Sequence, residues 1–160
     1  MEYFKIGQDR RLPYSVMPEM SGAGGFKESK SGDISQLDDI TVLQTDSGQE
    51  NFYPDILDRQ IFMIKGVVKD VFEMFLPGMT YKHCYLNEEN KCEQYIIPEL
   101  DILDIQTGVD EGLYIFRRAD TKDIEVIISL EAAEAVLRRK PAGIRIVLAE
   151  ASGLSGGVYV

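Results

Sequence analysis

The sequence predicts an α+β protein in which short strands outnumber helices. Residues 65–76 and 130–140 carry apolar side chains at helical spacing, whereas several shorter runs are rich in the Ile, Leu, Val and aromatic residues that strands favour. The strand-like runs do not alternate regularly with the two helices, so a parallel β-α-β architecture is not expected. We therefore expect a largely antiparallel sheet with two main helices.

The length and composition are those of a folded chain. The 160 residues fit one domain, and the 44% apolar and 28% charged residues lie close to globular averages. We expect residues 1–160 to form a single domain, with a long irregular N-terminal arm over residues 7–51 and a glycine-rich tail over residues 152–160.

The predicted arm follows a short first strand at Tyr3-Phe4-Lys5-Ile6. From Gly7 to Gly32 the sequence has no sustained period and is interrupted by Pro13, Pro18, Gly22, Gly24 and Gly25. Residues 33–45 give mixed signals, and the polar residues 46–51 are typical of a turn.

The first helix has a clear apolar face and a clear end. Pro77 and Gly78 follow it directly and should stop it. Lys69, Asp70 and Glu73 lie on its polar side. Its apolar face should carry Val67, Val68, Val71, Phe72, Phe75 and Leu76.

A β-hairpin is expected after this helix. Tyr81–Leu86 and Tyr95–Ile97 have strand composition and flank the polar residues 87–91, which include two turn-favouring asparagines. Cys84 and Cys92 would then lie near the two sides of the turn.

Three further strands are expected after the hairpin. Leu100–Ile105, Leu113–Arg117 and Ile124–Ile128 should be successive antiparallel strands, since glycines and polar residues separate them.

The second helix has matching signals at both ends. Ser129 should cap its N-terminus, Glu131 and the basic residues 138–140 match the helix dipole, and Pro141 should end it. Ile144–Leu148 should form a last strand.

Composition also bears on location and partners. No apolar run is long enough to span a membrane, the first residues do not look like a secretory signal, and only two cysteines occur. A reducing cytoplasm is therefore expected. The formal charge of −10 disfavours nucleic acid and would attract a basic protein, although surplus acid can also serve solubility alone.

Two candidate catalytic sites fail on context. Gly153-Leu154-Ser155-Gly156-Gly157 has the letters of a nucleophile elbow, but only three residues follow it here, so we do not expect the helix, acid and histidine that such a site requires. His83 is the only histidine, and its neighbours offer no orienting carboxylate, so a surface or satisfied strand histidine is the simpler interpretation. No catalytic residue is assigned.

Metal and phosphate sites are also weakly supported. His83, Cys84 and Cys92 lack the fourth ligand and the short cysteine spacing of structural zinc sites, and free thiols are expected. Asp101 and Asp104 are three residues apart, which places them on opposite faces of a strand; Asp104 could anchor the strand end. Gly22-Ala23-Gly24-Gly25 is not directly followed by a lysine-serine or lysine-threonine pair, and it lacks a glycine at the third glycine position of a dinucleotide-binding loop. No metal or cofactor is expected.

Several segments together are similar to those of a known family. They are Tyr95-Ile96-Ile97 running through Leu100-Asp101-Ile102-Leu103-Asp104, then Ile115-Phe116-Arg117, Val126-Ile127-Ile128-Ser129, the helix through Ala135 and Gly143-Ile144-Arg145-Ile146, with Ile61-Phe62-Met63-Ile64 leading into Val67–Leu76 upstream. On these residues the chain resembles immunity-protein family eleven of bacterial polymorphic toxin systems, over roughly Ile56–Leu148. The resemblance lies mostly in core-forming positions, and it implies a protein that binds and neutralises a cognate toxin.

The resulting functional expectation is a non-enzymatic protein that binds a protein partner, such as a basic toxin domain, and neither nucleic acid nor a membrane. A binding adaptor, a secretion chaperone and a small hydrolase that uses carboxylates and His83 remain alternatives, and a homodimer through an edge strand fits all of them. The candidate partner-binding residues are carboxylates in the expected turns, although ordinary surface solvation also accounts for them: Glu88, Glu89, Glu93, Asp110 and Glu111.

Overall fold

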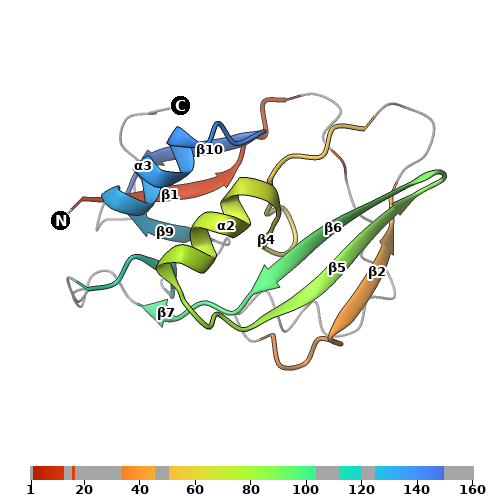
Figure 1. Ribbon diagram of the computed structural model, residues 1–160, viewed down its shortest axis with the longest axis horizontal. Coiled ribbons are helices and arrows are strands. Elements are labelled where there is room, and N and C mark those ends of the chain that lie inside the picture. The colour runs from red at the N-terminus through yellow and green to blue at the C-terminus, as the bar shows by residue number, and fades with distance from the viewer. Residues whose placement is uncertain are drawn as a thin grey trace.

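The computed structural model describes residues 2–12, 16, 34–45, 51–103, 112–119 and 125–149. Two helices and ten strands lie in these ranges, and the strands form two five-stranded, mostly antiparallel sheets. The α+β class is therefore confirmed. The strands are divided between two sheets where one was expected (Figure 1).

The first sheet has the strand order β10-β1-β9-β8-β7. Its strands are β10 (Ile144–Leu148), β1 (Tyr3–Gln8), β9 (Val126–Ser129), β8 (Ile115–Arg118) and β7 (Ile102–Leu103). β1 lies between β10 and β9 and is antiparallel to both, and β8 is antiparallel to β9.

One pairing in this sheet differs from the prediction. β7 is parallel to β8, with Ile102 opposite Arg117, so the expectation of successive antiparallel strands is wrong for this pair. The backbone amide of Arg117 donates to the carbonyl of Asp101 and that of Ala119 to the carbonyl of Leu103, both at 2.8 Å. The two bonds extend the parallel pairing beyond the two residues of β7 itself.

The second sheet has the strand order β2-β5-β6-β4-β3. Its strands are β2 (Ile40–Gln44), β5 (Tyr81–Glu88), β6 (Lys91–Pro98), β4 (Met63–Ile64) and β3 (Ile56–Leu57). The predicted β5–β6 hairpin is confirmed. Its strands are longer than expected, because pairing continues to Glu88 opposite Lys91 and leaves only Glu89 and Asn90 in the turn.

The predicted irregular arm is partly wrong. Gly7 and Gln8 belong to β1, and β2 pairs in parallel with β5, with Ile40 opposite His83. Leu43 of β2 is buried, and three further arm residues are buried in the same hydrophobic cluster: Val16, Ile34 and Leu37.

Both predicted helices are present. α2 (Gly66–Phe75) buries Val68, Val71 and Phe72 and ends just before Pro77-Gly78, where Gly78 has a φ of 77°. α3 (Leu130–Arg138) begins as predicted: the Ser129 side chain accepts a hydrogen bond from the amide of Ala132 at 3.2 Å. Glu131 lies in its first turn and Arg138 in its last, in accord with the helix dipole.

β6 contributes to two hydrophobic cores. Ile96 faces the first core, which α2, α3 and the first sheet also supply, whereas Tyr95 and Ile97 face the second core. All three side chains are at most 1% exposed. Burial on both faces explains why Tyr95–Ile97 is a continuous apolar run without alternation.

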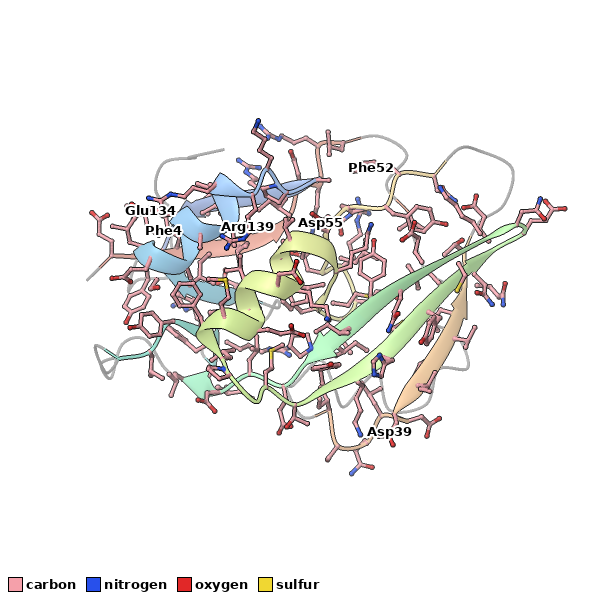
Figure 2. All side chains as sticks on the ribbon, in the orientation of Figure 1. Phe4, Asp39, Phe52, Asp55, Glu134 and Arg139 are labelled. Carbon is pink, nitrogen blue, oxygen red and sulfur yellow. The ribbon has the colours of Figure 1, made fainter. Side chains whose placement is uncertain are left out.

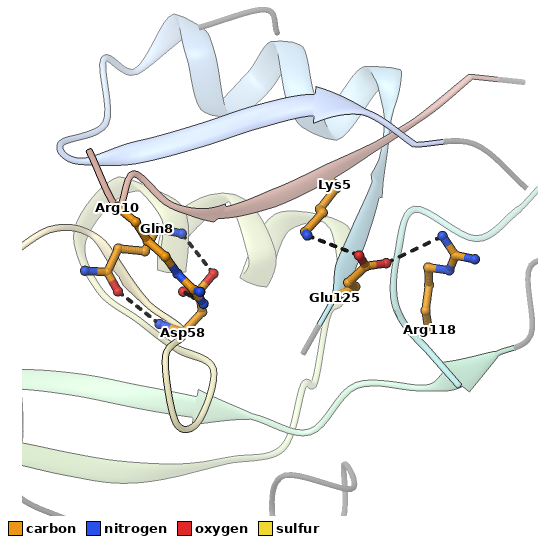
Figure 3. Close-up of polar contacts among 6 residues, drawn as sticks. All are labelled: Lys5, Gln8, Arg10, Asp58, Arg118 and Glu125. Atoms are coloured by element: carbon orange, nitrogen blue, oxygen red, sulfur yellow. Dashed lines mark hydrogen bonds and ion pairs between the residues drawn. The ribbon is translucent and has the colours of Figure 1, made fainter. Parts of the chain in front are cut away.

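Two buried carboxylates of the segment before α2 accept hydrogen bonds from residues in or next to the first sheet. Asp58 accepts hydrogen bonds from the Gln8 amide and from Arg10, both at 3.0 Å (Figure 3). Asp55 accepts one from the amide of Ala142, also at 3.0 Å. Elsewhere in the first sheet, Glu125 bridges Lys5 and Arg118 (Figure 3).

Candidate protein-binding surface

The β5–β6 hairpin projects from the rest of the molecule. In Figure 1 its two green strands run from beside α2 to one end of the molecule, away from both helices. Eight residues in each strand keep the pairing continuous to the tip. The turn residues Glu89 and Asn90 therefore lie at the end of two strands that are hydrogen-bonded along their whole length.

Glu88, the last residue of β5, is held in a fixed orientation. Its Oε1 accepts a hydrogen bond from Asn51 Nδ2 at 3.1 Å, and its Oε2 accepts one from the Tyr53 hydroxyl at 2.5 Å. The Tyr53 side chain is buried, and Lys91 Nζ lies 4.9 Å from the centre of its ring. Burial and the bond to Glu88 raise the pKa of Tyr53 to about 12, so this phenol stays protonated and can donate near neutral pH.

Glu93 belongs to a second polar group farther from the tip. Its Oε2 lies 3.7 Å from Lys65 Nζ, which is also 4.0 Å from Asp55 Oδ1 and 5.8 Å from the centre of the Tyr95 ring. The Tyr95 hydroxyl donates to the carbonyl of Pro54 at 2.6 Å. Glu93 is therefore partly committed to an internal ion pair.

Three of the five candidate carboxylates lie on this hairpin. Glu89 is exposed in the turn, whereas Glu88 and Glu93 are partly buried, so the expectation that all three are exposed is correct for Glu89 alone. Asp110 and Glu111 lie outside the described residues. A shallow, polar groove open to solvent follows the tip and is lined by Gln44, Asn87, Glu88, Glu89, Asn90, Lys91 and Cys92.

Fixed carboxylates of this kind suit the recognition of cationic groups. Carboxylate oxygens that neutral donors already orient can accept further charge-assisted hydrogen bonds from Arg or Lys. Binding through such hydrogen bonds involves no chemical reaction. The tip can therefore contribute electrostatic recognition, with Glu88 as the ordered acceptor and Glu89 as the exposed one.

A second exposed feature was missed by the sequence analysis. Ile40 and Val42 of β2 project from one face of the second sheet, opposite His83 and Tyr85 of β5 in the strand register. The run Ile40-Thr41-Val42-Leu43 is rich in β-branched residues and was the signal for this strand, but the polar residues around it obscured the pattern. We call Ile40, Val42, His83, Tyr85 and Gln94 the open face.

His83 has the ordinary surroundings of a strand histidine. Its Nδ1 lies 3.0 Å from Gln94 Nε2, and its ring meets the ring of Tyr81 edge-on. Nearby, Lys82 pairs with Asp39 at 2.8 Å, and this hydrogen bond lowers the pKa of Asp39. The hydrogen-bond partner and the ring contact of His83 fit the structural interpretation made from the sequence.

The two cysteines are free and face opposite sides of the sheet. Cys84 is buried in the second core opposite Tyr95, whereas Cys92 is exposed opposite Asn87. Residues 84 and 87 of one strand point in opposite directions, so a disulfide across this hairpin does not fit the register. Burial raises the pKa of the Cys84 thiol to about 12.

Among the described residues, no group of three or more His, Cys, Asp or Glu side chains is placed to hold a metal ion. Asp101 is exposed just before β7, and Asp104 lies outside the described ranges, as do residues 22–25 and 153–157. A cavity of about 10 Å³ between the sheets, lined by residues such as Ile97, Leu100 and Arg117, has room for one water molecule at most.

No protein-family model matches this sequence, and no curated protein matches it significantly. Within the described part of the chain, no helix has both the length and the apolarity needed to cross a membrane. The resemblance to immunity-protein family eleven therefore remains an expectation drawn from the residues quoted for it.

Proposed function

We propose that this chain is a non-enzymatic protein-binding protein that neutralises a cognate bacterial toxin. The observation that carries the proposal is the hairpin tip, where Tyr53 and Asn51 orient Glu88 beside the exposed Glu89. A tip of this kind can enter a basic cleft and occupy it. Occlusion needs no chemistry in the inhibitor.

The charge of the whole chain supports the same proposal. A formal charge of −10 creates a field that draws a basic domain toward the chain and raises the association rate. The core-position resemblance to immunity-protein family eleven adds the expectation that the bound protein is a toxin. The net charge raises the rate at which the partner associates and orients its approach. The ordered carboxylate of Glu88 supplies a fixed contact.

The test begins with capture of partners by the tagged protein from its native lysate at low and moderate salt. Salt-sensitive recovery of a stoichiometric basic protein is the expected result. The captured toxin is then expressed in cells with and without this chain. Survival only in its presence supports neutralisation, equal killing overturns it, and an active but bound partner would instead indicate an adaptor or chaperone.

A matched pair of variants tests the hairpin tip. Glu89→Lys should slow association with the partner by roughly tenfold at low salt, because a charge at the rim of an interface acts mainly on the association rate. Glu134→Lys makes the same change in net charge on α3, at the far end of the molecule from the hairpin tip (Figure 2). Equal slowing by both variants would show that net charge alone matters and that the tip is not the contact.

A further inference from the structure

We infer that the outer edge of β2, together with the open face, is the docking site for an extended segment of the partner that carries apolar residues at alternate positions and Lys or Arg at its ends. The inference rests on the proposed protein-binding function and names a second contact surface for it. The binding mode is addition of one strand to the second sheet.

One side of the β2 backbone pairs with no other strand in the described part of the chain. Asp39 accepts from the His83 amide at 2.8 Å and the Thr45 amide donates to Asn87 at 3.0 Å, so the odd-numbered residues of β2 face β5. In a parallel ladder the residues between them direct their N–H and C=O groups the other way. Across the ranges that the structure describes, β2 pairs with β5 alone and is the edge of its sheet.

The side chains on this edge are unusually apolar for their exposure. Ile40 is 58% exposed and Val42 is 54% exposed, and both sit on the open face beside Tyr85. Exposed edge strands commonly carry Lys, Pro or a bulge that blocks further pairing, and Ile40–Gln44 contains no charge and no proline. An added strand would cover both side chains and pair with the free amides.

The charges at the two ends of β2 favour a basic segment. Asp38 and Asp39 are exposed at its start, although Asp39 already pairs with Lys82. At its other end the register brings Gln44 beside Asn87, next to Glu88 and Glu89. In Figure 2 Asp39 lies at the opposite end of β2 from the hairpin tip. A strand that lies along β2 therefore has carboxylates near both of its ends.

The same charges disfavour a second copy of this chain as the occupant. Two-fold antiparallel pairing of β2 with another β2 would bring Asp38 and Asp39 of each copy toward Glu88 and Glu89 of the other. Like charges opposed at an interface cost affinity and slow association. The carboxylates near the two ends of β2 therefore attract a basic extended segment and repel a second copy of this chain.

The first experiment uses a synthetic nine-residue peptide with blocked ends, Lys-Lys-Val-Thr-Val-Thr-Val-Lys-Lys, and a counterpart with Glu in place of every Lys. Amide hydrogen exchange of the intact protein is followed by NMR at saturating peptide. The lysine peptide should slow exchange at Ile40, Val42 and Gln44 by at least about tenfold, because their amides become hydrogen-bonded. Thr41 and Leu43, which already pair with β5, should change little.

The second experiment measures the affinity of the lysine peptide for variants of β2. Val42→Pro removes an outward N–H and leaves the bonds to β5 in place, so it should weaken binding at least about tenfold. Val42→Lys tests the same contact without proline, should Val42→Pro fail to fold. Met74→Lys is the control: it adds the same charge at a side chain that is 56% exposed on α2, and binding should stay within about twofold.

Several results would overturn the inference. They are equal protection by the glutamate peptide, undiminished binding to a folded Val42→Pro or Val42→Lys protein, and protection of the three amides by self-association without peptide. Neutralisation of the toxin by folded Val42→Pro protein as well as by wild type would reject this surface and leave the proposed function intact. Absence of any neutralisation by wild type, with peptide docking retained, would reject the function alone.

Discussion

The hydroxyl of Tyr53 lies 2.5 Å from Oε2 of Glu88 and fixes the last carboxylate of β5 to the segment that precedes α2. Tyr53 is buried in the second core, so the bond connects that core to the hairpin tip. Removal of one hydroxyl should therefore affect both stability and the order of the tip.

Tyr53→Phe should lower the free energy of unfolding by about 1.5–3 kcal/mol, which is typical for a hydrogen bond to a charged acceptor. Urea unfolding monitored by circular dichroism would measure the change. Tyr85→Phe on the open face is the matched control and should cost less than about 0.5 kcal/mol. Equal losses in the two variants would contradict a stabilising role for the bond to Glu88.

Alkaline pH should destabilise the protein through buried tyrosines. Burial raises the pKa of Tyr53 from 10.0 to about 12, and it also raises that of Tyr95. The unfolded chain loses these protons near pH 10 and the folded chain does not, so stability is full below about pH 10 and falls as pH rises through about 12. Tyr53→Phe should reduce this loss, as measured by urea unfolding across the same pH range.

Gly143→Ala should destabilise the protein more than Gly78→Ala. Both glycines have positive φ, 69° and 77°, so each alanine adds roughly 1 kcal/mol of backbone strain. A Cβ at Gly143 would also lie 2.5 Å from Pro54 Cβ and 2.7 Å from Phe52 Cε1, whereas one at Gly78 meets nothing within 4 Å. Thermal and urea unfolding should give roughly 2–4 kcal/mol for Gly143→Ala. Equal losses in the two variants would show that Pro54 and Phe52 move away from the added Cβ at no cost in free energy.

The two thiols should react at very different rates. Cys92 is exposed, whereas Cys84 is fully buried and burial raises its thiol pKa to about 12, so little thiolate forms and reagents cannot reach it. A colorimetric disulfide reagent should modify one thiol rapidly in the native protein and the second only in denaturant. Cys92→Ser should remove the rapid phase. Two rapid phases in wild type would contradict the burial of Cys84.

Local sequence signals predicted elements well where local physics determines them. The apolar stripe of α2, the Ser129 cap of α3 and the bounds of β10 all follow from short-range patterns, and each is present in the structure. The β5–β6 hairpin was also predictable, because turn-favouring residues separate two strand-like runs.

Long-range pairing was not predictable in the same way. The parallel contacts of β2 with β5 and of β7 with β8 join segments whose own sequences do not specify a partner. Division of the strands into two sheets depends on Ile96 facing one core and Tyr95 the other, which composition cannot reveal. Glu88 was a candidate because of its position near the expected turn, but its bonds to Asn51 and Tyr53 depend on the tertiary fold.

The central position of β1 has a consequence during synthesis. Phe4 pairs with both Ile128 and Leu148, so β1 is synthesised well before either of its partner strands. At translation rates of about 5–20 residues per second, the interval is on the order of ten seconds. Throughout it, β1 has neither of the strands that flank it in the sheet. The first sheet therefore closes only after Val126–Ser129 and Ile144–Leu148 have been made.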